Sequence, residues 1–202
     1  MTTTSIKEEL EFLFGKTECS QKELEQITSL TISRMNDFGD EIYDVDLSDL
    51  SLFPNLKSLF FRLMIIDSDV VKAMGRCGIE AIYLKKCQLT DDVAQALTNM
   101  NLKLICLDNT KFKREIIESV EAEELIIIGS VVNKTFSPCA KKVDISRSDI
   151  EEYVLNENNE KIVISQKQYD KNKKYWEESK KEVIIMEDNG QYEYKRLGVN
   201  YG

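Results

Sequence analysis

A short apolar pattern recurs along most of the chain. Segments of the form φ-x-x-φ-x-φ-x-x-(small)-x-φ, in which φ is an apolar residue, start near Leu24 and continue to Tyr169. Two apolar residues separated by one residue lie on the same face of a short strand. Because such short strands are unstable alone, the pattern predicts coils whose strands stack into one parallel sheet. The central apolar position of each copy falls at Leu30, Leu59, Ile82, Ile105, Leu125, Val143 and Ile162, and an eighth copy would contain Val183 and Ile185.

The intervals between the early strands have room for helices. Residues 68–74 and 90–97 each begin with a capping residue followed by acidic residues, and their apolar residues are spaced to face one side. Residues 113–120 have a similar pattern. The later intervals are shorter, which predicts turns in place of helices.

Both ends of the chain have the pattern of a cap that covers an open sheet edge. We predict an N-terminal helical cap over residues 1–21, since residues 5–8 form a capping box and Ile6, Leu10, Leu13 and Phe14 make a helical stripe. Residues 20–23 are a second capping box. At the other end, a helix over 169–181 leads into a predicted C-terminal cap over residues 171–202, which also has a hairpin that turns at Asn189-Gly190.

Residues 79–92, with the sequence IEAIYLKKCQLTDD, resemble the cysteine- and helix-containing repeats of the leucine-rich-repeat family. The resemblance covers about residues 22–170, and seven copies are in register. It implies an α/β solenoid with a curved parallel sheet of about seven to eight short strands and with helices or turns on the convex side. The chain departs from the family where an Asn is usual. A Thr or Ser hydroxyl can replace the Asn by bonding to nearby backbone, but Met and Lys cannot. The residues at that position are Met35, Met64, Cys87, Thr110, Ser130, Ser148 and Lys167.

The residue between the two core positions of each strand points to the opposite face of the sheet. A sheet face in contact with solvent is normally polar, yet this row contains Phe60, Tyr83, Cys106 and Ile126. The adjacent row contains Arg62, Lys85, Asp108, Ile128 and Ser146. Aromatic and aliphatic residues bordered by charges are typical of a protein interface. The candidate partner-binding residues are therefore Phe60, Arg62, Tyr83, Lys85, Cys106 and Ile126.

These observations favour a non-catalytic protein–protein interaction module, of adaptor type, that binds a protein partner on the concave sheet face. One alternative is a structural or self-associating protein in which the apolar row forms a homodimer. A second is an enzyme that uses Cys106 or carboxylates. A third interpretation of the row is that a terminal segment of the chain folds over it.

Composition narrows the function classes. The chain of 202 residues has a net charge of −9, which opposes general binding to nucleic acid or anionic membranes. It contains no histidine, so it lacks Ser–His and Cys–His nucleophile pairs. The five cysteines include no CxxC pair, and the N-terminal residues lack the pattern of a signal peptide. We therefore expect a cytoplasmic protein without a cofactor or metal.

Three further groups of charged residues are typical of structural positions and not of sites. Asp91-Asp92 fits the first turn of a helix better than a metal site. Asp44, Asp46 and Asp49 lack the Gly and terminal Glu of a calcium-binding loop and fit a solvated strand edge. The lysines at 171, 173 and 174 are interspersed with acids, as on a solvated helix face.

Overall fold

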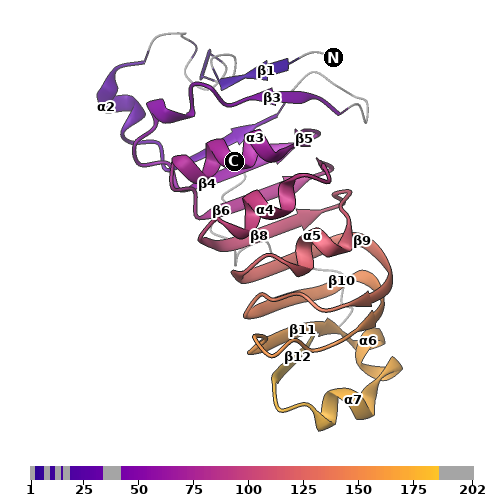
Figure 1. Ribbon diagram of the computed structural model, residues 1–202. Helices are drawn as coiled ribbons and strands as arrows, with labels where there is room; N and C mark the ends of the chain where they lie inside the picture. The colour runs from indigo at the N-terminus through magenta and orange to yellow at the C-terminus, as the bar shows by residue number, and fades with distance from the viewer. Residues whose placement is uncertain (1–2, 7–9, 12–14, 16–18, 34–41, 187–202) are drawn as a thin grey trace.

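The computed structural model describes residues 3–6, 10–11, 15, 19–33 and 42–186 (Figure 1). Its main feature is an eight-stranded parallel sheet whose strand order follows the order of the chain. The predicted α/β class, with a parallel sheet of seven to eight strands, is therefore confirmed. The strands are β2 (Ser29–Ile32), β4 (Ser58–Arg62), β6 (Ala81–Lys85), β8 (Leu102–Asp108), β9 (Ala122–Phe136), β10 (Lys142–Tyr153), β11 (Lys161–Ser165) and β12 (Glu182–Met186).

The register of the sheet matches the aligned apolar positions. Leu30 lies opposite Leu59, Leu59 opposite Ile82, and the match continues along the sheet to Val183 of β12. These residues and the ones two positions later point into the core in β2 to β11, where the exposed fraction of each is at most 2 %. Alternation then places the intervening residue on the opposite face, which we call the outer face.

Helices cover the core face of the early strands (Figure 1). They are α3 (Ser68–Arg76), α4 (Val93–Thr98) and α5 (Arg114–Glu118), at the predicted places. Each buries an apolar pair such as Val71 and Met74, because residues three or four apart share one helix face. The cap of α3 is Asp67, whose carboxylate accepts from the amides of Asp69 and Val70 at 3.0 and 2.9 Å, and not the expected Ser68.

A left-handed residue follows the core positions of four successive strands; it comes directly after β4, β6 and β8 and lies within β9. These residues are Leu63, Lys86, Asn109 and Gly129, with φ between 49° and 63°. The amides of Leu63, Lys86 and Asn109 donate to a carbonyl of the next strand at 2.8–3.0 Å. At Gly129 a Cβ atom would lie 2.5 Å from Oδ1 of Asn109, so a side chain at this position would require the Asn109 side chain to shift. The short strands β5 (Ile65–Ile66) and β7 (Gln88–Leu89) pair just beyond these turns.

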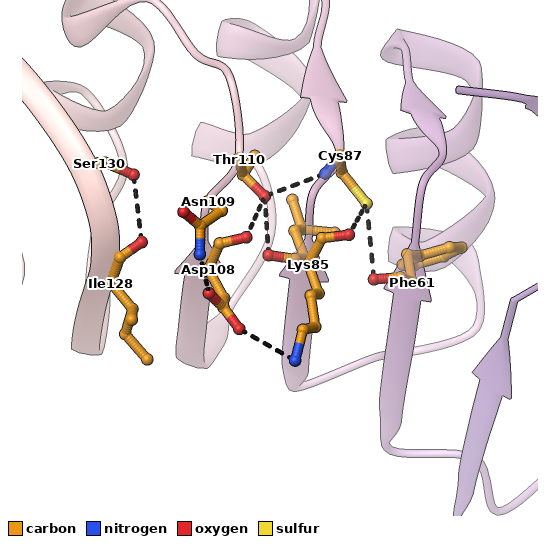
Figure 2. Close-up of polar contacts among 9 residues, drawn as sticks. Phe61, Lys85, Cys87, Asp108, Asn109, Thr110, Ile128 and Ser130 are labelled. Atoms are coloured by element: carbon orange, nitrogen blue, oxygen red, sulfur yellow. Dashed lines mark hydrogen bonds and ion pairs between the residues drawn. The ribbon is translucent and has the colours of Figure 1, made fainter. Parts of the chain in front are cut away.

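Beyond the turns at Lys86 and Asn109, a thiol and a hydroxyl side chain link neighbouring strands (Figure 2). The Thr110 hydroxyl donates to the Leu84 carbonyl at 2.7 Å and accepts from the Cys87 amide at 3.3 Å. The Cys87 thiol donates to the Phe61 carbonyl at 3.5 Å. The prediction that a hydroxyl can take this role is confirmed at Thr110.

The same pair of bonds recurs two strands later. The Ser148 hydroxyl donates to the Ile127 carbonyl at 2.8 Å and accepts from the Ser130 amide at 3.5 Å. The Ser130 hydroxyl instead donates to the Ile128 carbonyl of its own strand at 3.4 Å, so the ladder is interrupted there.

The last member of this ladder is Gln168, one residue after the aligned Lys167. Nε2 of Gln168 donates to the carbonyls of Ile145 and Ser148 at 3.0 and 2.9 Å. The position is one residue later than the sequence alignment predicts because α6 (Gln166–Lys171) begins directly after β11. The start of this helix directs the Gln168 side chain toward β10. The Ser165–Gln168 capping box fixes that start.

The late intervals contain turns, as expected: residues 137–141 and 154–160, all of them described, form no helix. Asn159 organises the second interval, and its side chain is fully buried. Its Nδ2 donates to the carbonyls of Pro138 and Ala140, and its Oδ1 accepts from the Asn156 amide and the Tyr153 hydroxyl.

The N-terminal cap begins with a strand that the sequence did not predict, β1 (Thr3–Ser5), which pairs with β3 (Asp44–Asp46). Helical backbone follows directly after Ser5, at Ile6, and again at Leu10 and Glu11, as the first capping box predicts. Ile6 and Leu10 are buried as expected, while Leu13 and Phe14 lie outside the described residues. The second capping box is present, at Ser20–Glu23, and starts α2 (Gln21–Leu24). A 3-10 turn, η1 (Leu50–Leu52), precedes β4.

The C-terminal helix is divided in two. The predicted helix over 169–181 is α6 followed by α7 (Lys173–Glu178), with non-helical backbone at Asn172. Trp176 of α7 is buried against Tyr153, with ring centroids 5.8 Å apart. The predicted eighth copy forms β12, and the Asn189-Gly190 hairpin lies outside the described residues. None of the described helices is both long and apolar enough to cross a membrane.

Candidate binding surface on the outer face

The register brings the six candidate residues together on the outer face of the sheet. Phe60, Tyr83, Cys106 and Ile126 are successive partners on four adjacent strands, and Arg62 pairs with Lys85 beside them. We call the full line of partners the outer row. It consists of Thr31, Phe60, Tyr83, Cys106, Ile126, Asp144, Val163 and Ile184.

An aromatic pair lies near the β2 end of the outer row. The rings of Phe60 and Tyr83 stack with centroids 6.0 Å apart and planes inclined by 21°. Both side chains are half-buried, so each still offers surface to a partner. Offset ring pairs of this kind are favourable beyond their buried area. The two strands thus hold a rigid apolar platform.

Further along, the outer row is buried. Cys106 and Ile126 are 5 % and 4 % exposed, although both had been expected to face a partner directly. Burial raises the pKa of the Cys106 thiol to about 12, and the Asp108 carboxylate adds to the increase. A thiol with that pKa is protonated at neutral pH, which makes it a poor nucleophile.

Charged side chains border the outer row on both sides. Arg62 is exposed, and Nζ of Lys85 lies 3.5 Å from a carboxylate oxygen of Asp108. Figure 2 shows this ion pair next to the hydroxyl ladder. On the other side, Lys161 pairs with Glu182 at 2.7 Å. These pairs are partly solvated, so each contributes little to stability but gives the border a defined charge pattern.

Arg147 is a border residue that the sequence alignment missed. The alignment placed Ser146 opposite Ile128, but an irregularity in β10 places Arg147 there. The Asp144 carboxylate causes the shift, because it accepts from both the amide and the hydroxyl of Ser146, at 3.0 and 2.7 Å. An Asp followed two residues later by Ser is the sequence signal for such a turn.

The other charged groups have structural partners. Asp91 pairs with Lys113, and a hydrogen bond from the Thr90 hydroxyl lowers the pKa of Asp92. Asp46 accepts from the Ser48 amide at 2.9 Å. Lys173 and Lys174 pair with the acid four residues later, at Glu177 and Glu178. Within the described ranges, no group of three or more Cys, Asp or Glu residues is arranged to hold a metal ion.

Comparison with protein-family models, curated proteins and solved structures found no match to this chain. The resemblance to leucine-rich repeats consequently stays a prediction from the residue pattern.

Proposed function

We propose that the chain is a leucine-rich-repeat solenoid that binds a protein partner on its outer face. Three observations support the repeat assignment: strands that follow chain order, left-handed turns at Leu63, Lys86, Asn109 and Gly129, and the hydroxyl ladder. Side chains of one coil bond to the backbone of the coil before it at Thr110 and Ser148, as expected when neighbouring repeats supply one another's missing contacts.

The outer row is the observation that carries the binding proposal. Four adjacent strands contribute Phe60, Tyr83, Cys106 and Ile126 to the face that is turned away from helices α3, α4 and α5. An apolar centre with a charged border is the composition of a partner-binding surface. We propose Phe60 and Tyr83 as the anchors, because aromatic residues dominate binding energy at interfaces.

A non-catalytic role fits the chemistry of the chain. It has no histidine, and the one thiol in the candidate surface, Cys106, has a pKa of about 12. A net charge of −9 disfavours a nucleic-acid or anionic-membrane partner. All five cysteines are free, which is consistent with a reducing compartment and leads us to propose a cytoplasmic location.

The test is a double substitution, Phe60→Ala with Tyr83→Ala, in the full chain. The matched control is Leu52→Ala with Val131→Ala, since these apolar side chains are 41 % and 64 % exposed at other places on the surface. We expect the wild-type chain and the control to retain the same partner in a pull-down and the double variant to lose it, with unchanged circular dichroism. Retention by the double variant would refute the proposal.

A second candidate function is self-association, in which the apolar residues of the outer row form a homodimer interface. Ultracentrifugation separates the two uses without a partner in hand. If the purified chain sediments as a dimer and the Phe60→Ala/Tyr83→Ala variant as a monomer, the occupant of the surface is a second copy.

A further inference from the structure

The segment after β8 and the second half of β9 are held together at two points. At the first, the Asn109 amide donates to the Ile128 carbonyl at 2.8 Å. At the second, Nη1 of Arg114 donates to the Thr135 carbonyl at 2.7 Å. Between these points, residues 110–113 form no backbone hydrogen bond to β9, and both stretches belong to the described part of the chain.

A second ladder of parallel pairs, which lies beyond the left-handed turns, has a break at the same place. On one side of the break β5 pairs with β7, and Gln88 of β7 pairs with Lys111. On the other side, Val132 of β9 pairs with Ile150 of β10. Among the described residues no pair joins Lys111 to β9, so the ladder lacks one step. The hydroxyl ladder is interrupted there as well, since Ser130 bonds within its own strand (Figure 2).

A groove of about 510 Å³ lies at the missing step, with residues 109–112 on one wall and residues 129–134 on the other. The amide and the carbonyl of Lys111 bond to the β7 side, to Cys87 and Leu89, at 2.9 Å each. Successive residues of an extended chain direct these groups to alternate sides, so those of Phe112 face β9. The Thr135 carbonyl points toward Arg114, which shows that this edge of β9 borders the groove. Two strand edges therefore face each other across it.

Cations dominate the groove. Lys111 and Lys134 are exposed on opposite walls, and Arg114 lies at one end. The one carboxylate among the lining residues is that of Glu115, which Arg114 binds at 3.0 Å. Three cations against one carboxylate leave a local excess of positive charge in a chain whose net charge is −9. Such an excess attracts an acidic ligand.

We propose that this groove binds an extended acidic segment of a protein partner, which adds the missing strand between Lys111 and β9. A strand added in this way is held by backbone hydrogen bonds, and its side chains set the specificity. Because successive side chains point to opposite sides, acidic residues meet the exposed Lys111 and Lys134, and the residues between them meet the half-buried Phe112. Residues 130–134 span roughly 16 Å at about 3.3 Å per residue, which fits a segment of about five residues. None of the lining residues belongs to the outer row, so the site is independent of the proposed function.

Binding of a synthetic peptide to the full chain tests the site. The probe is a fluorescein-labelled peptide of about seven residues in which glutamate and valine alternate, which is long enough to span the groove. The test variant is Lys111→Glu with Lys134→Glu, and the matched control is Lys22→Glu with Lys180→Glu, since these lysines are exposed and lie outside the groove. We expect fluorescence anisotropy to give the same Kd for the wild-type chain and the control, and a Kd at least tenfold higher for the test variant. The same Kd for all three proteins, or no saturable binding to the wild-type chain, would overturn the proposal.

Changes to the peptide test strand pairing while the protein stays wild type. A peptide methylated on alternate backbone nitrogens keeps its charges but loses the donors that face one wall, and it should bind at least tenfold more weakly. A peptide with lysine in place of glutamate should not bind. Hydrogen exchange of the Phe112 amide should be slower in the complex with the glutamate peptide, because this amide donates to the added strand. Equal affinity of the methylated or the lysine peptide, or unchanged Phe112 exchange at saturation, would overturn the proposal.

Failure of this inference can be distinguished from failure of the proposed function. The Phe60→Ala/Tyr83→Ala variant should bind the glutamate peptide as tightly as the wild-type chain does, and Lys111→Glu/Lys134→Glu should still capture the partner of the outer face. Loss of peptide binding in the first variant would place the peptide on the outer face and overturn the groove as its site. Loss of the outer-face partner in the second variant, with unchanged circular dichroism, would show that one ligand spans both surfaces and would overturn the claim of a separate site.

Discussion

Thr110→Val is the substitution that tests the hydroxyl ladder most directly. Valine has nearly the same shape as threonine, so the change removes the hydroxyl and leaves the volume of the site intact. Thr110 is 5 % exposed, and its hydroxyl bonds to the Leu84 carbonyl and the Cys87 amide. Both backbone groups lose this partner in the variant.

The expected cost follows from these two bonds. A buried polar group left without a partner costs about 1–3 kcal/mol, and the added methyl group returns part of this by burial. We expect Thr110→Val to lower the free energy of unfolding by about 2 kcal/mol. For a domain of this size, that loss corresponds to a decrease in Tm of roughly 4–8 °C.

Urea unfolding followed by circular dichroism measures this cost. The m-value must stay constant for the comparison with the wild-type chain to hold. Thr98→Val is the control, because the Thr98 hydroxyl bonds to the Ala94 and Ser119 carbonyls at the exposed surface, where water can replace it. We expect the control to change stability by less than about 0.5 kcal/mol. An equally small effect of Thr110→Val would show that the ladder does not hold the strands together.

Three further substitutions test other parts of the fold. Lys86 has φ 52°, a left-handed conformation that glycine adopts more easily, so Lys86→Gly should raise the free energy of unfolding by about 1 kcal/mol. Lys72→Gly, in the middle of helix α3, should lower it by about the same amount. Urea unfolding of both variants checks the two signs. Burial raises the pKa of Cys87 to about 12 from a usual 9.0, so the protonated thiol stabilises the fold below pH 9 and this contribution is lost as the pH rises toward 12. Between pH 7 and 10.5 the free energy of unfolding should therefore fall by about 2 kcal/mol more in the wild-type chain than in Cys87→Ala. Parallel plots of unfolding free energy against pH for the two proteins would contradict this. Asn159→Ala should lower the free energy of unfolding, measured by thermal unfolding, by at least about 3 kcal/mol because four hydrogen bonds involve its buried side-chain amide. The control, Asn158→Ala, should have almost no effect because Asn158 is exposed.

Much of the sheet was predictable because its strands obey a simple period. The core positions from Leu30 to Val183 were aligned from the sequence, and the register places them opposite one another. The outer row follows from that alignment by alternation alone, which is why Phe60 and Tyr83 were correctly placed as neighbours.

The sequence predictions fail at positions where a local hydrogen bond shifts the chain out of the apolar repeat pattern. Asp144 binds Ser146 and moves Arg147 into the border, and the Ser165–Gln168 capping box moves the ladder from Lys167 to Gln168. Burial of Cys106 was not predictable either, since alternation fixes the face on which a residue lies but not what covers that face.

The central claim is that Phe60 and Tyr83 anchor a protein partner on the outer face. Its most direct test is the Kd of the captured partner for the wild-type chain, for Phe60→Ala/Tyr83→Ala and for the Leu52→Ala/Val131→Ala control, measured by titration calorimetry. Loss of two aromatic anchors at about 2 kcal/mol each predicts weakening of roughly 1,000-fold, with the control within about threefold of the wild-type chain. Equal affinity of all three proteins would contradict the claim.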